Sequence, residues 1–294
     1  MRRQYCTSGS TTPSAWAVSL GPRDNGPVIA HSPQGPVVVP PAVIEVAAGR
    51  PAQAVWQNEL GGLTFQIGAG AGRQFVKWTP DSSGIDLSAE VARLRWAGAF
   101  LVVPRVLDEG ADEAGSWIVT AGLPGRSAVD DHWKRDPETA VRAIGAGLRA
   151  MHETLPVAGC PYDWAAGRRR EAVRARAAAG RIDPRRWPED LRHLGTTERA
   201  LGILADMPPV DRLVVCHGDP CAPNTLIGDD GVYTGHVDLG RLGVADRWAD
   251  LAVATWSTQW NYGPGWEEPL LEAYGVDADP ERTTYYRLLW ELAD

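Results

Sequence analysis

Hydrophobic residues between positions 43 and 121 occur in short runs that alternate with polar residues, the spacing typical of half-buried β-strands. The runs that we predict as strands are residues 43–46, 54–56, 63–67, 75–78, 100–107 and 116–120. Helical spacing interrupts them once, where Leu87, Val91 and Leu94 recur three or four residues apart. The first half of the chain therefore predicts a β-rich lobe that contains a helix.

The spacing becomes helical after a segment punctuated by Gly and Pro at residues 121–125. Residues 137–155 have apolar positions at helical intervals, with Asp136 as a predicted N-cap and Pro137 at the first helical position. Gly145 and Gly147 within this helix indicate that another part of the chain packs closely against it. A break between a β-rich and a helix-rich half is a natural lobe boundary.

We therefore expect an α+β fold with two lobes. Residues 1–40, which are rich in Pro, Gly and Ser, are predicted to form a partly ordered N-terminal extension. Residues 41–121 are predicted to form the β-rich N-lobe, and residues 122–294 the mainly helical C-lobe.

Three oxygen-bearing side chains lie on loops between short predicted strands. An apolar run at residues 213–216 predicts a buried strand, and Asp219 and Asn224 follow it in a Pro-containing loop. A hairpin-type turn signal at residues 229–231 then leads to Asp238. Because tight turns join these strands, we expect the three side chains to lie together on one side.

Such a set matches the needs of phosphoryl transfer, which requires a carboxylate to orient and deprotonate a hydroxyl and oxygen ligands for magnesium. We assign Asp219 to the first role, and Asn224 and Asp238 to binding Mg²⁺. A single HxD would be read as a solvated loop, but HGDxxxxN followed by DLG is far more specific. Arg241 either neutralises the aspartates or braces the loop, and we group it with Asp219 as catalytic. Asp246 and Asp250, which open a predicted helix, are expected to cap it and to brace the catalytic loop.

Lys77 lies between apolar residues in a predicted strand, and a buried ammonium group needs a partner. Phosphate oxygens together with a carboxylate would satisfy it. Gly61 and Gly62, which separate two predicted strands, would let backbone amides approach an anion closely. The sequence also allows a plain hairpin turn at these glycines and a lysine that reaches water at a sheet edge.

The formal net charge of −8 over 294 residues argues against a nucleic-acid partner and suits a cationic small molecule. Four cysteines lack CxxC spacing, so we expect reduced thiols and a cytoplasmic location. No apolar run approaches the roughly 20 residues of a membrane span, and no secretory leader is recognisable. We expect a monomer or weak dimer without a membrane partner.

The stretch from His217 to Asn224, followed by residues 237–247, resembles the aminoglycoside phosphotransferase family, most closely the branch that modifies 3′- or 3″-hydroxyls. The resemblance runs from about Trp56 to the C-terminus. It implies a fold similar to that of protein kinases, with ATP and Mg²⁺ as cofactors. It also implies phosphorylation of a hydroxyl on an aminoglycoside-type antibiotic, conferring resistance.

The resemblance further implies roles for residues whose spacing alone says little. Glu90 is similar to the glutamate that pairs with the strand lysine, here Lys77. The backbone of Ala121 and Leu123 would hydrogen-bond the adenine edge. The ammonium groups of the antibiotic would be held by acidic groups late in the chain, namely Glu267, Glu268 and Asp294.

Three alternatives remain at this point. The same chemistry could act on a nucleoside or peptide antibiotic or on a small metabolite. The pairs His217–Asp219 and His236–Asp238 could instead be HxD metal ligands of a hydrolase. The chain could also be a kinase-like binding protein without catalytic activity, although the complete set of lysine, aspartates and asparagine argues against that.

Overall fold

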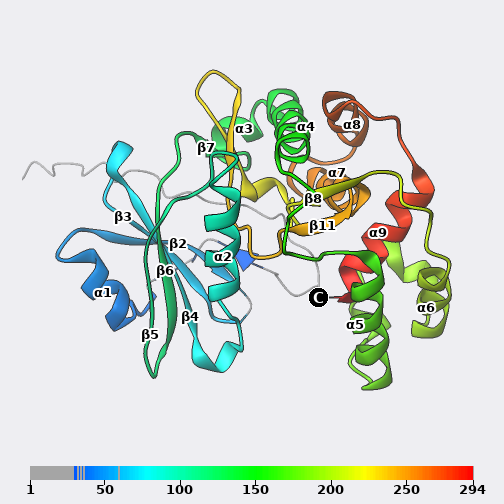
Figure 1. The fold of residues 1–294 in the computed structure, drawn as a ribbon, viewed down its shortest axis with the longest axis horizontal. Helices are drawn as coiled ribbons and strands as arrows, with labels where there is room; N and C mark the ends of the chain where they lie inside the picture. Colours follow the sequence, from blue (N-terminus) through cyan, green and yellow to red (C-terminus); the bar gives the residue numbers. More distant parts are fainter. Residues whose placement is uncertain (1–29, 32, 34, 36, 59, 294) are drawn as a thin grey trace, which may run out of the picture.

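The computed structural model describes residues 30–31, 33, 35, 37–58 and 60–293. They form a β-rich lobe and a mainly helical lobe, which lie side by side (Figure 1). The predicted α+β two-lobe architecture is confirmed. Most of the predicted N-terminal extension lies outside the described residues. No helix in the described part of the chain combines the length and apolar character needed to span a bilayer.

The N-lobe is built on a six-stranded antiparallel sheet in the order β1-β2-β3-β4-β6-β5. Its strands are β1 (Ala30–His31), β2 (Ala52–Asn58), β3 (Leu63–Ile67), β4 (Gln74–Pro80), β5 (Val106–Ala111) and β6 (Gly115–Ala121). Two helices accompany the sheet, α1 (Pro41–Ala47) and α2 (Ser88–Ala97). The region that was predicted to be β-rich therefore forms one continuous sheet.

Alternation along the strands divides the sheet into two faces, because successive side chains of a strand point in opposite directions. Phe65 on β3 and Val76 on β4 are fully buried in a cluster that includes Val43 of α1. The intervening residues, among them Phe75 and Lys77, point to the opposite face and line a cavity. The strand pattern thus places Lys77 on the cavity side.

The prediction of a strand at residues 43–46 is wrong, since these residues belong to α1. Pro41 occupies the first turn of this helix, where its missing N–H is not needed. Val43 and Ala47, four residues apart, face the sheet, while Ile44 between them is exposed. A run of four residues is too short to be assigned as strand or helix from alternation alone. The burial of two residues four positions apart, Val43 and Ala47, is the helical pattern.

The predicted strand over residues 100–107 is also largely wrong, because β5 begins only at Val106. Amides of Phe100 and Leu101 donate to the carbonyl of Ala97 and thereby close the end of α2. Pro104 follows and has no N–H to contribute to a sheet. The apolar residues before Val106 therefore form a loop.

The C-lobe contains most of the helices. They are α3 (Asp131–Lys134), α4 (Pro137–Thr154), α5 (Ala166–Ala178), α6 (Thr197–Ala205), α7 (Trp248–Tyr262), α8 (Glu267–Tyr274) and α9 (Pro280–Ala293). Short strands complete it: β7 (Arg126–Ser127), β8 (Leu213–Cys216), β9 (Thr225–Ile227), β10 (Tyr233–His236) and β11 (Gly243–Asp246). β8 pairs with β11, and β10, β9 and β7 form a separate small sheet.

Helix α4 is the predicted helix, and the Asp136 side chain accepts a hydrogen bond from the amide of Thr139 (3.3 Å) as its N-cap. The predicted close packing at its glycines is also present. A Cβ on Gly145 would collide with the backbone carbonyl of Leu270 in α8, and one on Gly147 would lie 2.5 Å from the ring of Tyr233 in β10. Gly145 thus lets α4 pack closely against α8, and Gly147 lets it pack against the hairpin that leads to Asp238.

Candidate active site

A buried carboxylate on α7 holds the loop that follows β8. Asp250 is fully buried, and its oxygens accept hydrogen bonds from the backbone amides of His217 (2.6 Å) and Gly218 (3.0 Å). Its Oδ2 also lies 2.9 Å from Nε2 of His152. Burial alone would raise the pKa of Asp250, but the hydrogen bond to His152 and the backbone amides lower it. The predicted bracing of the catalytic loop is therefore present.

Asp246 has the second predicted role, which is to cap the helix α7. Its Oδ1 accepts a hydrogen bond from the amide of Trp248 (3.0 Å), at the start of α7. Its Oδ2 accepts one from the amide of Asp211 (2.8 Å), in the segment that precedes β8. Asp246 therefore caps the helix on which Asp250 is positioned.

The contacts of Asp250 lead to a prediction about stability. In Asp250→Asn the side-chain NH₂ would face one of the two loop amides, so a buried N–H would lose its acceptor. We expect the free energy of unfolding to fall by about 1–3 kcal/mol, measured by urea denaturation. Asp112→Asn is the matched control, since Asp112 also accepts two backbone amides but in an exposed turn. Equal losses in the two variants would contradict the assignment.

Asp219 lies in the loop that Asp250 holds, and its amide donates to Nδ1 of His217 (3.2 Å). Its Oδ1 is buried, and no described residue donates a hydrogen bond to it. Burial raises the pKa of Asp219, an effect that the charge of Arg241 opposes and that of Asp238 reinforces. Because a buried acceptor without a donor costs about 1–3 kcal/mol, this oxygen is suited to receive a hydrogen bond from a bound hydroxyl.

Asn224 connects this loop to the strand end beyond it. Its side-chain NH₂ donates to the backbone carbonyl of Asp219 (2.9 Å), and its own backbone carbonyl accepts from Val237 (3.0 Å). With the NH₂ engaged, the amide oxygen of Asn224 is the atom that can bind a cation. Asn224 and Asp238 both line the cavity.

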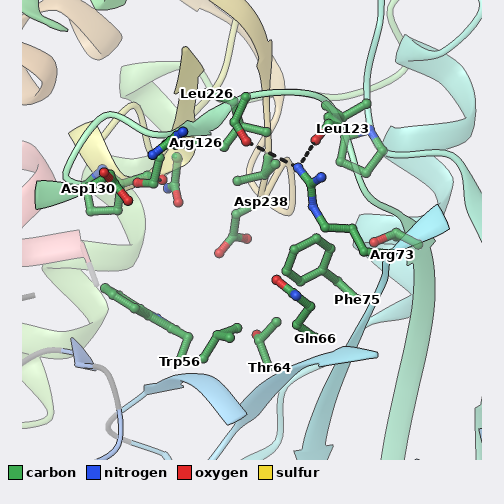
Figure 2. Close-up of a pocket in the computed structure, with 18 of the residues that line it drawn as sticks. Trp56, Thr64, Gln66, Arg73, Phe75, Leu123, Arg126, Asp130, Leu226 and Asp238 are labelled. Carbon is green, nitrogen blue, oxygen red and sulfur yellow. Dashed lines mark hydrogen bonds between the residues drawn. The ribbon is translucent and has the colours of Figure 1, made fainter. Parts of the chain in front are cut away.

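Asp238 has an unusual backbone conformation. Its φ is 62°, and Ala48 is the other non-glycine residue with positive φ in the described part of the chain. Aspartate tolerates this left-handed region better than most residues, but the conformation still costs on the order of 1–3 kcal/mol. The strained backbone turns the carboxylate into the cavity, where Figure 2 shows it pointing toward the centre.

Lys77 on β4 bridges the two lobes through ion pairs. Its Nζ lies 2.7 Å from Oε2 of Glu90 and 2.8 Å from Oδ1 of Asp238. Burial alone would lower the pKa of Lys77, but the two carboxylates raise it well above its ordinary value. The predicted Lys77–Glu90 pair is therefore present, and Asp238 completes a cluster of one cation and two anions.

The cavity between the lobes has a volume of about 940 Å³. The N-lobe sheet contributes one wall, with Trp56, Thr64, Gln66 and Phe75 pointing inward (Figure 2). The opposite wall comes from the C-lobe, where Leu226 lines it. A cavity that combines apolar and aromatic side chains with convergent charged groups can bind a ligand that has both an aromatic ring and charges.

The predicted phosphate-loop glycines form the turn between β2 and β3 and do not line this cavity. Gly61 has φ 81°, and the amides of Leu60 and Gly62 donate to Oδ1 of Asn58 (3.0 and 2.7 Å). Gly62 instead borders an adjoining cavity of about 130 Å³, which is also lined by Lys77 and Asp238. Their predicted contact with phosphate stays a prediction.

Residues 121–125 connect the two lobes and are called the linker below; two of them, Ala121 and Leu123, line the cavity, and their contact with a bound base stays a prediction. The amide of Ala121 already donates to the carbonyl of Arg105 (2.9 Å). The carbonyl of Leu123 accepts a hydrogen bond from Arg73.

The predicted substrate acids lie away from the described cavity. Oε2 of Glu267, in the first turn of α8, lies 3.2 Å from a guanidinium nitrogen of Arg287, and its Oε1 accepts a hydrogen bond from Gln259. Glu268 is exposed beside it. Asp294 lies outside the described residues. The role of these acids in substrate binding stays a prediction.

Phe75 and Arg73 were not predicted, although both contribute to the cavity. The available signal was the strand period, because Arg73, just before β4, and Phe75 and Lys77 within it are spaced two residues apart. Once Lys77 was assigned to the cavity face, the same alternation placed the other two there.

Among the described residues, the histidines and aspartates of the hydrolase alternative do not form a group that could hold a metal ion. Both ring nitrogens of His217 have backbone partners, the amide of Asp219 (3.2 Å) and the carbonyl of Val237 (3.0 Å). Nδ1 of His236 lies 3.3 Å from Oγ1 of Thr225. A buried group of His152, Cys216 and Asp250 could in principle hold a metal, but hydrogen bonds already occupy its carboxylate and imidazole. The geometry therefore does not favour a His-based metal centre.

Comparisons with known proteins agree with this arrangement. A sequence model of the phosphotransferase enzyme family matches residues 58–286. The chain is 36% identical over 262 residues to an aminoglycoside 3′-phosphotransferase from Streptomyces fradiae, covering 81% of this chain and 94% of the relative. It is 35% identical over 266 residues to a streptomycin 3″-kinase from Streptomyces griseus, covering 86% and 95%.

A solved structure shows the same fold. The aminoglycoside phosphotransferase APH(3″)-Id from Streptomyces rimosus, in complex with ADP and streptomycin, aligns with a TM-score of 0.63 and 29% sequence identity. The alignment covers 79% of this chain and 90% of that chain.

Proposed function

This chain belongs to the phosphotransferase enzyme family, and we propose that it transfers the γ-phosphoryl group of ATP to a hydroxyl of an aminoglycoside-type antibiotic and so confers resistance. The observation that carries this proposal is the buried Oδ1 of Asp219, which has no donor among the described residues, in a loop that Asn224 joins to the cavity lined by Lys77, Asn224 and Asp238. The names of the relatives, and the complex of one of them with ADP and streptomycin, support the choice of substrates.

Asp219 orients the acceptor hydroxyl. Its Oδ1 accepts the hydrogen bond of the hydroxyl and takes the proton as the oxygen attacks the γ-phosphorus. Asp250 does not contact the substrate in this step. It accepts hydrogen bonds from the backbone amides of His217 and Gly218 and thereby fixes the position of Asp219. Most of the rate enhancement in such a reaction comes from positioning of this kind and from charge stabilisation.

Magnesium fits the donor set at the strand end. The amide oxygen of Asn224 and the carboxylate of Asp238 are hard oxygen ligands, the type that Mg²⁺ prefers, and both face the cavity. These two residues would hold the ion, which when bound neutralises charge on the triphosphate. Lys77 contributes a fixed positive charge to the phosphates, and Glu90 keeps it in place.

One of the acids proposed to hold the antibiotic is already paired. Because Arg287 neutralises Glu267, fewer free carboxylates are available there for the ammonium groups of an antibiotic.

The purified chain should be incubated with ATP, Mg²⁺ and either streptomycin or a kanamycin-type aminoglycoside, and the products analysed by mass spectrometry. We expect one added phosphate on at least one of them, with fragmentation identifying the hydroxyl. A nucleoside and a sugar metabolite serve as alternative acceptors. Phosphorylation of these alone would reassign the substrate, and ATP hydrolysis or binding without any phosphorylated acceptor would refute the proposal.

A further inference from the structure

One arginine closes the linker end of the cavity. Arg73, just before β4, lines the cavity, and its Nη2 donates hydrogen bonds to the backbone carbonyls of Leu123 and Gly125 (3.2 Å to the latter). Its Nη1 donates to the carbonyl of Gly70 (3.2 Å). Figure 2 shows the guanidinium reaching from the N-lobe sheet to the linker. Backbone carbonyls from both lobes therefore hold this side chain in place.

The neighbouring linker residue leaves room for this arrangement. The amide of Gly122 donates to the carbonyl of Arg73 (2.9 Å), and a Cβ on Gly122 would lie 2.6 Å from Cγ of Arg73. Gly122 is not one of the glycines with positive φ, so its backbone does not require glycine. A side chain at this position would meet the stem of Arg73 and, at 3.0 Å, its backbone carbonyl oxygen.

The arginine changes which hydrogen bonds the linker can offer to a nucleobase. In the described part of the chain, no residue accepts a hydrogen bond from the amide of Leu123, so this donor is available to a base. The Leu123 carbonyl, the acceptor on the same residue, is occupied by Arg73. Leu123 therefore presents a free donor beside a carbonyl that already accepts from a guanidinium, a group with donors only.

Adenine and guanine differ in what they need from such an edge. Adenine has an acceptor at N1 and a donor at its 6-amino group, whereas guanine has an acceptor at O6 and donors at N1 and N2. Adenine can accept from the Leu123 amide and donate to the carbonyl of Ala121, which also lines the cavity. Guanine, if it accepts at O6 from the same amide, directs its two donors at the occupied Leu123 carbonyl.

We propose that Arg73 is a nucleobase-selectivity residue, which makes the enzyme prefer ATP to GTP by occupying the carbonyl of Leu123. The inference rests on the proposed function and deepens it, because it identifies the group that distinguishes the two phosphoryl donors. A base that leaves its own donors unpaired in a buried site binds markedly more weakly, and the donor-only guanidinium of Arg73 at the Leu123 carbonyl opposes the two guanine donors in this way.

The test is direct binding of ADP and GDP to the purified full chain, measured by isothermal titration calorimetry with Mg²⁺ and without an acceptor. We expect the wild-type chain to bind ADP about tenfold or more tightly than GDP, and Arg73→Met to reduce this ratio by about tenfold through tighter GDP binding. Gly122→Ala should shift the ratio in the same direction, because the new methyl group displaces the Arg73 stem.

Arg50→Met is the matched control. Arg50 also donates to backbone carbonyls, those of Ala47 (3.1 Å) and Val46 (3.0 Å), but it does not line the cavity. Its replacement should leave the ADP-to-GDP ratio unchanged.

The outcomes separate this inference from the proposed function. If Arg73→Met or Gly122→Ala folds, as judged by circular dichroism, and keeps the wild-type ratio, the role of Arg73 is refuted while phosphorylation of aminoglycosides can still be found. If the ratio shifts but mass spectrometry detects no phosphorylated aminoglycoside, the choice of acceptor is wrong and the role of Arg73 stands. If the wild-type chain binds neither nucleotide, both are refuted.

Discussion

Replacing Asp219 with asparagine is expected to lower kcat by about 10²–10⁴-fold, the usual contribution of a positioned general base. Asparagine keeps the shape of the side chain but cannot take a proton from the acceptor hydroxyl. Because Asp219 does not line the cavity between the lobes, where we expect the nucleotide to bind, the Kd for ADP should change by less than about threefold. Steady-state kinetics with an aminoglycoside acceptor, combined with calorimetry, would measure both quantities. Near-normal turnover by Asp219→Asn would remove the catalytic assignment.

The same assignment predicts the pH dependence of the wild-type enzyme. Burial raises the pKa of Asp219, and the proton acceptor works only in its ionised form. Activity should therefore fall as the pH decreases through this raised pKa, so the acidic limb of kcat/KM should lie at higher pH than an exposed aspartate would give. A profile that stays flat down to the ordinary pKa of aspartate would contradict the role of Asp219, provided that circular dichroism shows an intact fold.

Local sequence predicted the catalytic loop well because the relevant interactions are close in the chain. Asn224 contacts the backbone of Asp219 five residues earlier, and Glu90 pairs with Lys77 thirteen residues earlier. The position of Asn224 follows from a motif spacing within one short segment, whereas the partner of Lys77 was implied by the family resemblance. The contact of Lys77 with Asp238 spans 161 residues and follows only from the two-lobe fold.

Other features left no readable signal in the sequence. The partners of Arg73 are backbone carbonyls, which every residue possesses, so no side chain elsewhere in the chain indicates the contact. The pairing of Glu267 with Arg287 depends on how α8 and α9 pack, and the sequence suggested a free acid. At residues 43–46, the apolar residues fit both the strand period of two and the helix period of 3.6. The chain forms a helix there, which buries Val43 together with Ala47.

Replacing Asp238 with asparagine is expected to lower kcat/KM for Mg·ATP by about 10²-fold or more, because a charged magnesium ligand contributes several kcal/mol to stabilising the phosphates. Asparagine tolerates the positive φ of Asp238, so the fold should be retained. The concentration of Mg²⁺ needed for half-maximal activity should rise in Asp238→Asn but not in Asp219→Asn, which separates a metal ligand from a base. Asp230→Asn, in the exposed turn that precedes β10, serves as the surface control and should behave like the wild type. An unchanged Mg²⁺ requirement in Asp238→Asn would place the metal elsewhere, and the contact with Lys77 would then be the main role of this carboxylate.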